Sequence, residues 1–208
     1  MARGDVVLAE VVEVTTRSHG VVVPGLVRAA LEQSGIDWPD LQGIAVSIGP
    51  GSFTGLRIGL ALAKGIAYAG KLPLVAVPTL EALAWAAEPV VGDLVWAMLD
   101  ARMREVYVAA FERTTHGLER RTPDEAVAPE ALAARIVGPA VLIGDAPRAY
   151  PVLGREGVRV LPFESHHPRG GIVARLGAAR LAAGEQASLG PLEPVYVRPS
   201  QAELARRR

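Results

Sequence analysis

This 208-residue chain contains no cysteine. That absence excludes disulfide bonds, thiolate metal sites and cysteine catalysis. Asparagine is also absent, and lysine occurs only at Lys64 and Lys71. Because arginine replaces lysine almost throughout, we attribute the bias to a GC-rich genome and treat the arginine content as weak evidence for phosphate binding.

An excess of charge of either sign is missing too, since 22 basic residues balance 22 acidic ones. A balanced chain has no overall positive field to hold a nucleic acid, so any RNA contact must be local or come through a partner. No apolar run reaches about 18 residues, the length that spans a membrane. The first five residues lack a secretory signal pattern, and we expect a cytoplasmic protein without membrane contact.

Half of the chain is hydrophobic, which supplies a sizeable core and excludes a disordered protein. The alternation of strand and helix patterns predicts an α/β fold. We assign one lobe to residues 1–98 and another to residues 99–208, with the polar segment 114–123 as the best candidate for a loop between lobes. Strands are expected over residues 6–14, 43–48, 72–77, 94–99, 106–111, 140–143 and 192–197, and helices over residues 21–33, 56–69, 80–87, 129–137 and 168–183.

The strongest local signal is the glycine-rich loop of residues 49–55, which joins a buried strand to a helix. Such a turn exposes backbone N–H groups to an anion such as phosphate. The spacing fits neither a Walker loop nor a dinucleotide fingerprint. The alternative is a tight turn with Ser52 or Thr54 as the helix N-cap. On the first interpretation the loop faces a nucleotide through Gly49, Gly51, Ser52, Thr54 and Gly55.

The two helices expected over residues 21–33 and 56–69 have almost no polar face. A surface helix normally carries a wide polar face, and small residues four apart allow another helix to approach closely. Either one face packs on the sheet and the other meets a partner, or both helices are buried within their own lobe. On the first interpretation the interface residues are Val23, Leu26, Val27, Ala30, Arg57, Gly59, Leu60 and Ala63.

A second dense segment begins at Asp100 and Arg102. The two side chains can pair at a hairpin turn, or Asp100 can bind a metal with water, but an isolated Asp in a turn is usually an Asx-turn acceptor. No metal-binding spacing joins His19, His116, His166 and His167. We therefore expect no metal and no catalytic residue, and we assign Asp100 and Arg102 a structural role at the lobe junction.

Several motifs together resemble the TsaB (YeaZ) family, and the resemblance runs from about residue 5 to residue 203. They are residues 49–59, Lys64 with Gly65, residues 77–80, residues 100–103 with 105–107, residues 194–200 with Ala202 and Glu203, and residues 16–19 ahead of the first helix.

The resemblance implies a two-lobed fold of the actin/Hsp70/sugar-kinase (ribonuclease H-like) type. It also implies a non-catalytic scaffold and activator subunit of the complex that forms N6-threonylcarbamoyladenosine in tRNA. That subunit pairs with TsaD through helices of the first lobe, joins the ATPase TsaE, forms homodimers when alone, and reaches tRNA through the complex. It has no cofactor of its own, and ATP or ADP is expected at the interface of the complex.

Two rivals remain: a phosphotransferase of the same superfamily, and a peptidase. The family's transferase carries a metal-binding HxxxH and the sugar kinases a phosphate loop on the first strand, and neither motif is seen here. The sequence also shows no zinc-ligand set for a peptidase. The family normally begins with two strands, the first ending in Asp-Thr-Ser, and this sequence shows neither. We therefore expect a first lobe without those strands and hypothesise that Met1 is an internal position of a longer chain.

Overall fold

The computed structural model describes residues 1–13, 19–164 and 167–197. The chain folds into two compact units, each described below by itself. Among the described residues, the first unit comprises Met1–Pro78 and Gly170–Val195, and the second comprises Thr79–Arg169 together with Tyr196 and Val197. No helix in the described part of the chain is long and apolar enough to cross a membrane.

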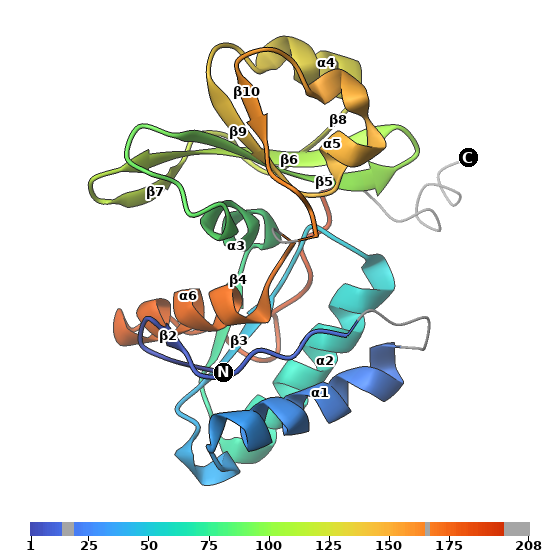
Figure 1. Cartoon of the computed structure of the whole chain (residues 1–208). Coiled ribbons are helices and arrows are strands. Elements are labelled where there is room, and N and C mark those ends of the chain that lie inside the picture. Colours follow the sequence, from blue (N-terminus) through green and yellow to red (C-terminus); the bar gives the residue numbers. More distant parts are fainter. Residues whose placement is uncertain (14–18, 165–166, 198–208) are drawn as a thin grey trace. The chain divides into compact units, whose positions relative to one another are not determined.

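The first unit is built around a strand–helix–strand crossover (Figure 1). Strand β3 (Ile44–Ser47) runs parallel to β4 (Leu74–Val77), and helix α2 (Phe53–Gly70) connects them. Helix α6 (Gly170–Ala182) packs on both strands, and helix α1 (His19–Ser34) packs against α2. The unit also contains the short 3₁₀ helix η1 (Trp38–Asp40) and the antiparallel hairpin of β1 (Ala2–Arg3) and β2 (Val6–Val7), which packs on α6.

Glycine lets α6 lie close to the sheet. A Cβ atom on Gly177 would lie 2.3 Å from the Cβ of Ala45 on β3, which is far inside van der Waals contact. Arg180 of the same helix donates from Nη1 to the carbonyl oxygen of Ala76 at 2.6 Å. The helix is therefore fixed to both strands by a close approach and by a hydrogen bond.

The second unit contains a six-stranded sheet in the order β10-β9-β5-β6-β7, with β8 also paired to β6. Helix α3 packs on β5 and β6, and α5 also contacts β5. The strands are β5 (Leu94–Arg102), β6 (Glu105–Thr114), β7 (Gly117–Arg120), β8 (Glu125–Val127), β9 (Ala140–Ile143) and β10 (Val158–Val160). The helical elements are α3 (Thr79–Ala86), α4 (Pro129–Arg135), α5 (Ala146–Ala149) and the 3₁₀ turn η2 (Pro151–Leu153).

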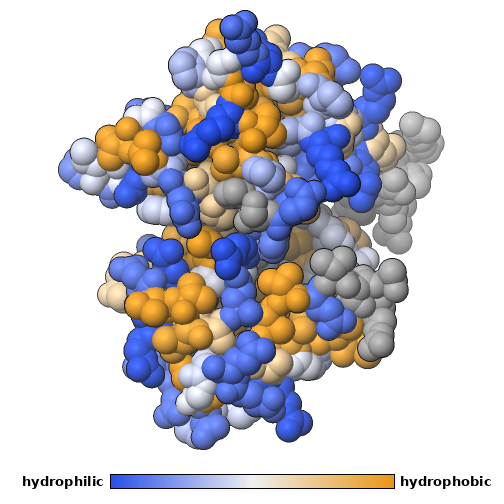
Figure 2. Space-filling view, viewed as in Figure 1, coloured by the Kyte–Doolittle hydropathy of each residue, from blue (hydrophilic) through white to orange (hydrophobic). Residues whose placement is uncertain are grey.

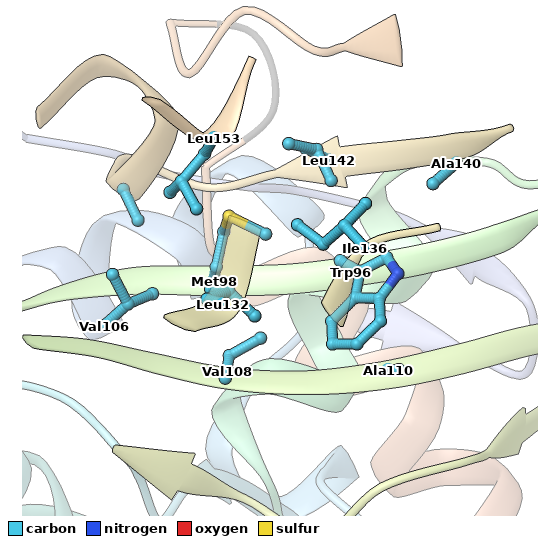
Figure 3. Close-up of a cluster of buried hydrophobic side chains, with 11 residues drawn as sticks. Trp96, Met98, Val106, Val108, Ala110, Leu132, Ile136, Ala140, Leu142 and Leu153 are labelled. Atoms are coloured by element: carbon cyan, nitrogen blue, oxygen red, sulfur yellow. The ribbon is translucent and has the colours of Figure 1, made fainter. Parts of the chain in front are cut away.

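Alternate residues of β5 and β6 are buried on opposite faces of this sheet. Trp96 and Met98 join a hydrophobic cluster with side chains of β6, β9, α4, α5 and η2 (Figure 3). Val95 and Ala97, which alternate with them along the strand, are fully buried as well. The sheet thus has two covered faces, which explains why its strands read as nearly continuous apolar runs.

Most elements lie within a few residues of the predicted ranges, and the 140–143 strand matches residue for residue. The strand predicted over residues 6–14 is wrong, since only Val6–Val7 pair and residue 14 lies outside the described part. The strand predicted over residues 192–197 is also wrong. No strand forms in that described segment, where Val195 N donates a hydrogen bond to Ile48 O at 2.7 Å.

The division into units also differs from the predicted one at 98/99. Strand β5 pairs with β6 and β9 from Leu94 and Val95 onward, so residues 94–98 belong to the second unit. Helix α6 returns to pack on β3 and β4 of the first unit. The segment 114–123 contains β7, which pairs with β6, so it does not link the two units.

Candidate functional site

The glycine loop at residues 49–55 is shaped by two local requirements. Gly49 has φ 117°, and a Cβ atom there would lie 2.6 Å from the carbonyl oxygen of Val195. Ser52 is the N-cap of α2, because its Oγ accepts a hydrogen bond from Gly55 N at 3.3 Å. The tight-turn alternative thus accounts for Gly49, Ser52 and Gly55. Thr54 is exposed and Gly51 lies against Leu56, so the nucleotide-facing role of the loop stays a prediction.

Helix α1 presents an apolar surface that this chain covers only in part. Of its described side chains, Leu31 alone is buried, whereas Val21 is 75% exposed. The charged residues Arg28 and Glu32 pair with each other at 2.8 Å on the solvent side. The four predicted interface residues on α1 are all half-buried: Val23, Leu26, Val27 and Ala30.

Helix α2 separates the other predicted interface residues into two groups. Leu60 and Ala63 belong to the core cluster of the first unit, with Val46, Ala67 and Leu74, so they are not part of its surface. Gly59 instead faces open space, since a Cβ atom there would meet nothing within 4 Å. No neighbour in the structure therefore requires glycine at position 59.

Arg57 lies on the exposed part of α2, one turn after Phe53. Its guanidinium stacks over the Phe53 ring, with 3.8 Å from Cζ to the ring centroid. Such a stack holds the planar cation over an aromatic face and fixes its position on the helix. Of the eight predicted interface residues, the four on α1 together with Arg57 and Gly59 are therefore at least partly exposed, and their role in binding a partner stays a prediction.

A polar network surrounds Asp100 near the end of β5. Its Oδ1 accepts hydrogen bonds from Arg102 N at 2.9 Å and from the Tyr150 hydroxyl at 3.0 Å. Its backbone N–H donates to Asp145 Oδ1 at 2.8 Å. Desolvation and the hydrogen bond to the Asp100 carboxylate raise the pKa of Tyr150 above its usual value. The Asx turn expected at Asp100 is confirmed, and the placement of Asp100 and Arg102 at a lobe junction stays a prediction.

The partners of Asp100 were missed by sequence reasoning. Gly144 and Asp145 follow β9. Gly144 has φ 118°, and its backbone lies so close to β5 that a Cβ atom there would be 1.8 Å from Met98 O. A Gly-Asp pair directly after a buried strand was the available signal. The packing of segment 186–195 against the rest of the first unit was also missed. This segment is held to α2 by a hydrogen bond from Lys64 Nζ to Gly190 O at 3.2 Å, and Leu189 and Leu192 pack on the core of the first unit.

Within residues 1–13, 19–164 and 167–197, no three side chains of His, Cys, Asp or Glu gather as metal ligands would. His116 is exposed in a turn, and the His167 ring lies edge-on to Phe163 with the ring centroids 6.1 Å apart. His166 lies outside the described residues, and the His19 side chain is not described.

Comparisons with known proteins place the chain in a family. The family model described as "TsaD: tRNA N6-adenosine threonylcarbamoyltransferase" matches residues 7–141. The Escherichia coli tRNA threonylcarbamoyladenosine biosynthesis protein TsaB is 35% identical over 192 residues, which cover 89% of this chain and 83% of that protein. The tRNA N6-adenosine threonylcarbamoyltransferase of Nitrobacter hamburgensis is 42% identical over 70 residues, only 20% of its length.

Among solved structures, YeaZ from Pseudomonas aeruginosa superposes with a TM-score of 0.76 at 27% identity, over 88% of this chain and 86% of that one. This likeness and the family model fit the actin/Hsp70/sugar-kinase-like α/β fold that the sequence predicts. The chain therefore belongs to the TsaB (YeaZ) family of tRNA threonylcarbamoyladenosine biosynthesis proteins.

Proposed function

We propose that this chain is a scaffold and activator subunit of the tRNA threonylcarbamoyladenosine machinery that performs no chemistry itself. In this role it pairs with TsaD through the exposed face of α1 and α2, and TsaE joins the pair. ATP or ADP is held at the interface of the complex, and tRNA is reached through the complex, in the cytoplasm. The same face supports a homodimer when TsaD is absent.

Two observations carry the proposal: the half-covered apolar face of α1, and the open position at Gly59 on α2, the helix against which α1 packs. A helix with one charged pair in 16 residues and no fully buried stripe leaves apolar area in contact with water. Burying that area is favourable by about 25 cal/mol per Å², so a second protein gains free energy by covering it. A glycine with nothing near it lets the partner's backbone approach.

The non-catalytic part of the proposal is supported by how much of each relative the chain matches. The match to the Escherichia coli biosynthesis protein spans most of both chains, whereas the match to the Nitrobacter transferase is short. About four fifths of that transferase is therefore not aligned with this chain.

The test is co-purification with TsaD from the same organism. Gly59→Leu should lower recovery of TsaD at least tenfold, because a Leu side chain blocks close approach of the partner helix. Gly65→Leu is the matched control, since Gly65 also faces open space on α2 and both changes favour the helix equally. Equal recovery of TsaD with the two variants would overturn the interface, and ATP turnover by the isolated chain would overturn the scaffold role.

A further inference from the structure

The β5–β6 hairpin ends in an exposed tip with an unusual sequence. Its connection consists of Met103 and Arg104, both with positive φ, at 53° and 59°. Positive φ at both loop residues is the pattern of a type I′ turn, which normally requires Asn-Gly or a similar pair. Arg102 ahead of them also has positive φ, at 62°. Three consecutive non-glycine residues therefore occupy a backbone region that each adopts only at a cost.

Hydrogen bonds of Asp100, near the end of β5, hold the base of the tip. The Asx turn at Asp100 fixes the Arg102 N–H, and Tyr150 and Asp145 fix Asp100 in turn. Below the tip, β5 and β6 pair along their length and lie in the most buried part of the second unit. Strained residues on a rigid support cluster at functional sites, because a sequence without a function there drifts toward relaxed turn residues.

The side chains at the tip are largely exposed. Arg102 and Arg104 are 86% and 84% exposed, and Met103 between them is 61% exposed. The ion pairs of the two guanidinium groups are long, at 3.4 Å to Asp100 and 3.4 Å to Glu130. A guanidinium has five N–H donors, so one long contact leaves most of its hydrogen-bonding capacity for a ligand.

The composition of the tip favours a protein partner over RNA. Met and Arg are both enriched at protein–protein interfaces, and Arg pairs with carboxylates through two parallel hydrogen bonds. A nucleic-acid site needs an unopposed run of positive charge. Here the tip carries only two arginines, which are separated by an apolar residue, and the whole chain carries no net charge.

We propose that Arg102, Met103 and Arg104 form a preorganised docking finger for a protein surface that carries carboxylates around an apolar recess. The two arginines pair with those carboxylates and Met103 enters the recess. The strain is retained because the αL backbone presents the two guanidinium groups on either side of the methionine. This contact belongs to the second unit and does not depend on the proposed role of α1 and α2.

The experiment places a photo-crosslinking residue in the full-length protein in its own cells, by Met103→p-benzoylphenylalanine. The matched control is Val90→p-benzoylphenylalanine, because Val90 is also exposed and lies in the loop before β5, beyond the opposite end of the hairpin. The proposal predicts an adduct at position 103 to a protein, with Asp or Glu in the crosslinked peptide. In an Arg102→Glu/Arg104→Glu background this adduct should fall at least tenfold.

An adduct to RNA, an adduct no stronger than at position 90, or one unaffected by the charge reversal would overturn the proposal.

The backbone strain at the tip is tested by a second experiment. Met103→Asn/Arg104→Gly should raise the melting temperature by about 2–4 °C, because relaxed turn residues remove the backbone cost, and an unchanged or lower value would contradict it. The identity of the adduct separates this proposal from the proposed function. TsaD or TsaE supports both, whereas another carboxylate-bearing protein supports the finger alone.

Discussion

The two units of this chain cover their apolar residues to very different extents. In the second unit both faces of the central sheet are buried, and the largest side chains of β5, β6 and β9 have almost no contact with water. In the first unit the sheet has two strands among the described residues, and α1 contributes a single buried side chain. Figure 2 shows hydrophobic residues at the surface of this unit near β2 and α6, where Val6 and Val7 are exposed.

This difference separates residues that stabilise from residues that remain available for binding. A side chain that is already buried contributes its free energy to folding, and one left half-exposed contributes the rest when a partner covers it. The second unit therefore has the character of a self-sufficient core, whereas under the proposed function another protein completes the surface of the first unit.

The largest effect is expected from Gly144→Ala in the second unit. A Cβ atom would lie 1.8 Å from the backbone oxygen of Met98, at a φ of 118° that alanine rarely adopts. The loss should exceed about 3 kcal/mol, since backbone strain adds to a clash that no side-chain movement relieves. Gly92→Ala is the control for strain alone, because φ there is 98° but the space is open. Urea unfolding measures both, and equal losses would show that the close approach at Gly144 is unimportant.

The same change in the first unit should cost less. Gly177→Ala on α6 clashes with the Ala45 Cβ atom at 2.3 Å, but α6 gains about 1 kcal/mol of helix propensity, and a helix can shift outward. We expect a net loss of about 1–2 kcal/mol by urea unfolding. Ala45→Gly in the same chain removes the clashing atom and should restore most of the loss. Failure of this rescue would mean that Gly177 is needed for another reason.

Truncating one leucine in each unit sharpens the comparison. Leu142→Ala empties part of the second unit's core and should cost about 3 kcal/mol. Leu26→Ala on half-buried α1 should cost only about 1 kcal/mol in the isolated chain. If TsaD covers α1, Leu26→Ala should additionally weaken TsaD binding several-fold, whereas Leu142→Ala should not change the affinity of the folded fraction. Calorimetric titration would contradict the account if Leu26→Ala left the affinity unchanged.

A smaller effect concerns pH. The pKa of Tyr150 is raised in the folded protein, so at alkaline pH the folded state binds more protons than the unfolded state. The contribution of this pKa shift to the free energy of unfolding is fully present below the ordinary tyrosine pKa of about 10. It is lost as pH rises through the raised pKa of Tyr150 in the folded protein. Tyr150→Phe should remove this part of the alkaline destabilisation, as measured by unfolding between about pH 8 and pH 11. Identical pH profiles for both proteins would contradict the hydrogen bond to Asp100.

The smallest effects come from ion pairs. Arg135 binds the Glu125 carboxylate with two hydrogen bonds, at 2.7 and 3.1 Å, which lower the pKa of Glu125. Arg135→Ala should cost about 1 kcal/mol, partly through lost packing over Trp96. The exposed pair of Arg28 and Glu32 should contribute only about 0.3–0.5 kcal/mol. Double-mutant cycles on each pair test this order, and a stronger Arg28–Glu32 coupling would reverse it.

The sequence predicted most elements because their patterns are local. Residues 140–143 form an uninterrupted apolar run, and the glycine-rich turn before α2 contains its own N-cap. The family resemblance rested on such segments and was confirmed by relatives that match most of the chain.

What the sequence did not predict depends on contacts between distant segments. The apolar residues at 6–14 have strand character, but among the described residues 6–13 only Val6 and Val7 pair with another strand. Leu60 and Ala63 share a helix with Gly59, yet only these two join the core cluster with Val46 of β3 and Leu74 of β4, strands that are distant from them in the sequence. Tyr150 lies 50 residues from Asp100, so no local pattern joins them.

Hydrogen exchange of the full-length chain, alone and with purified TsaD, tests the central claim most directly. The account predicts that amides of α1 and α2 gain protection when TsaD binds, while the central strands β5, β6 and β9 are already protected and do not change. Protection gained only in the second unit, or no change in α1 and α2 at saturating TsaD, would contradict the claim that the first unit carries the partner surface.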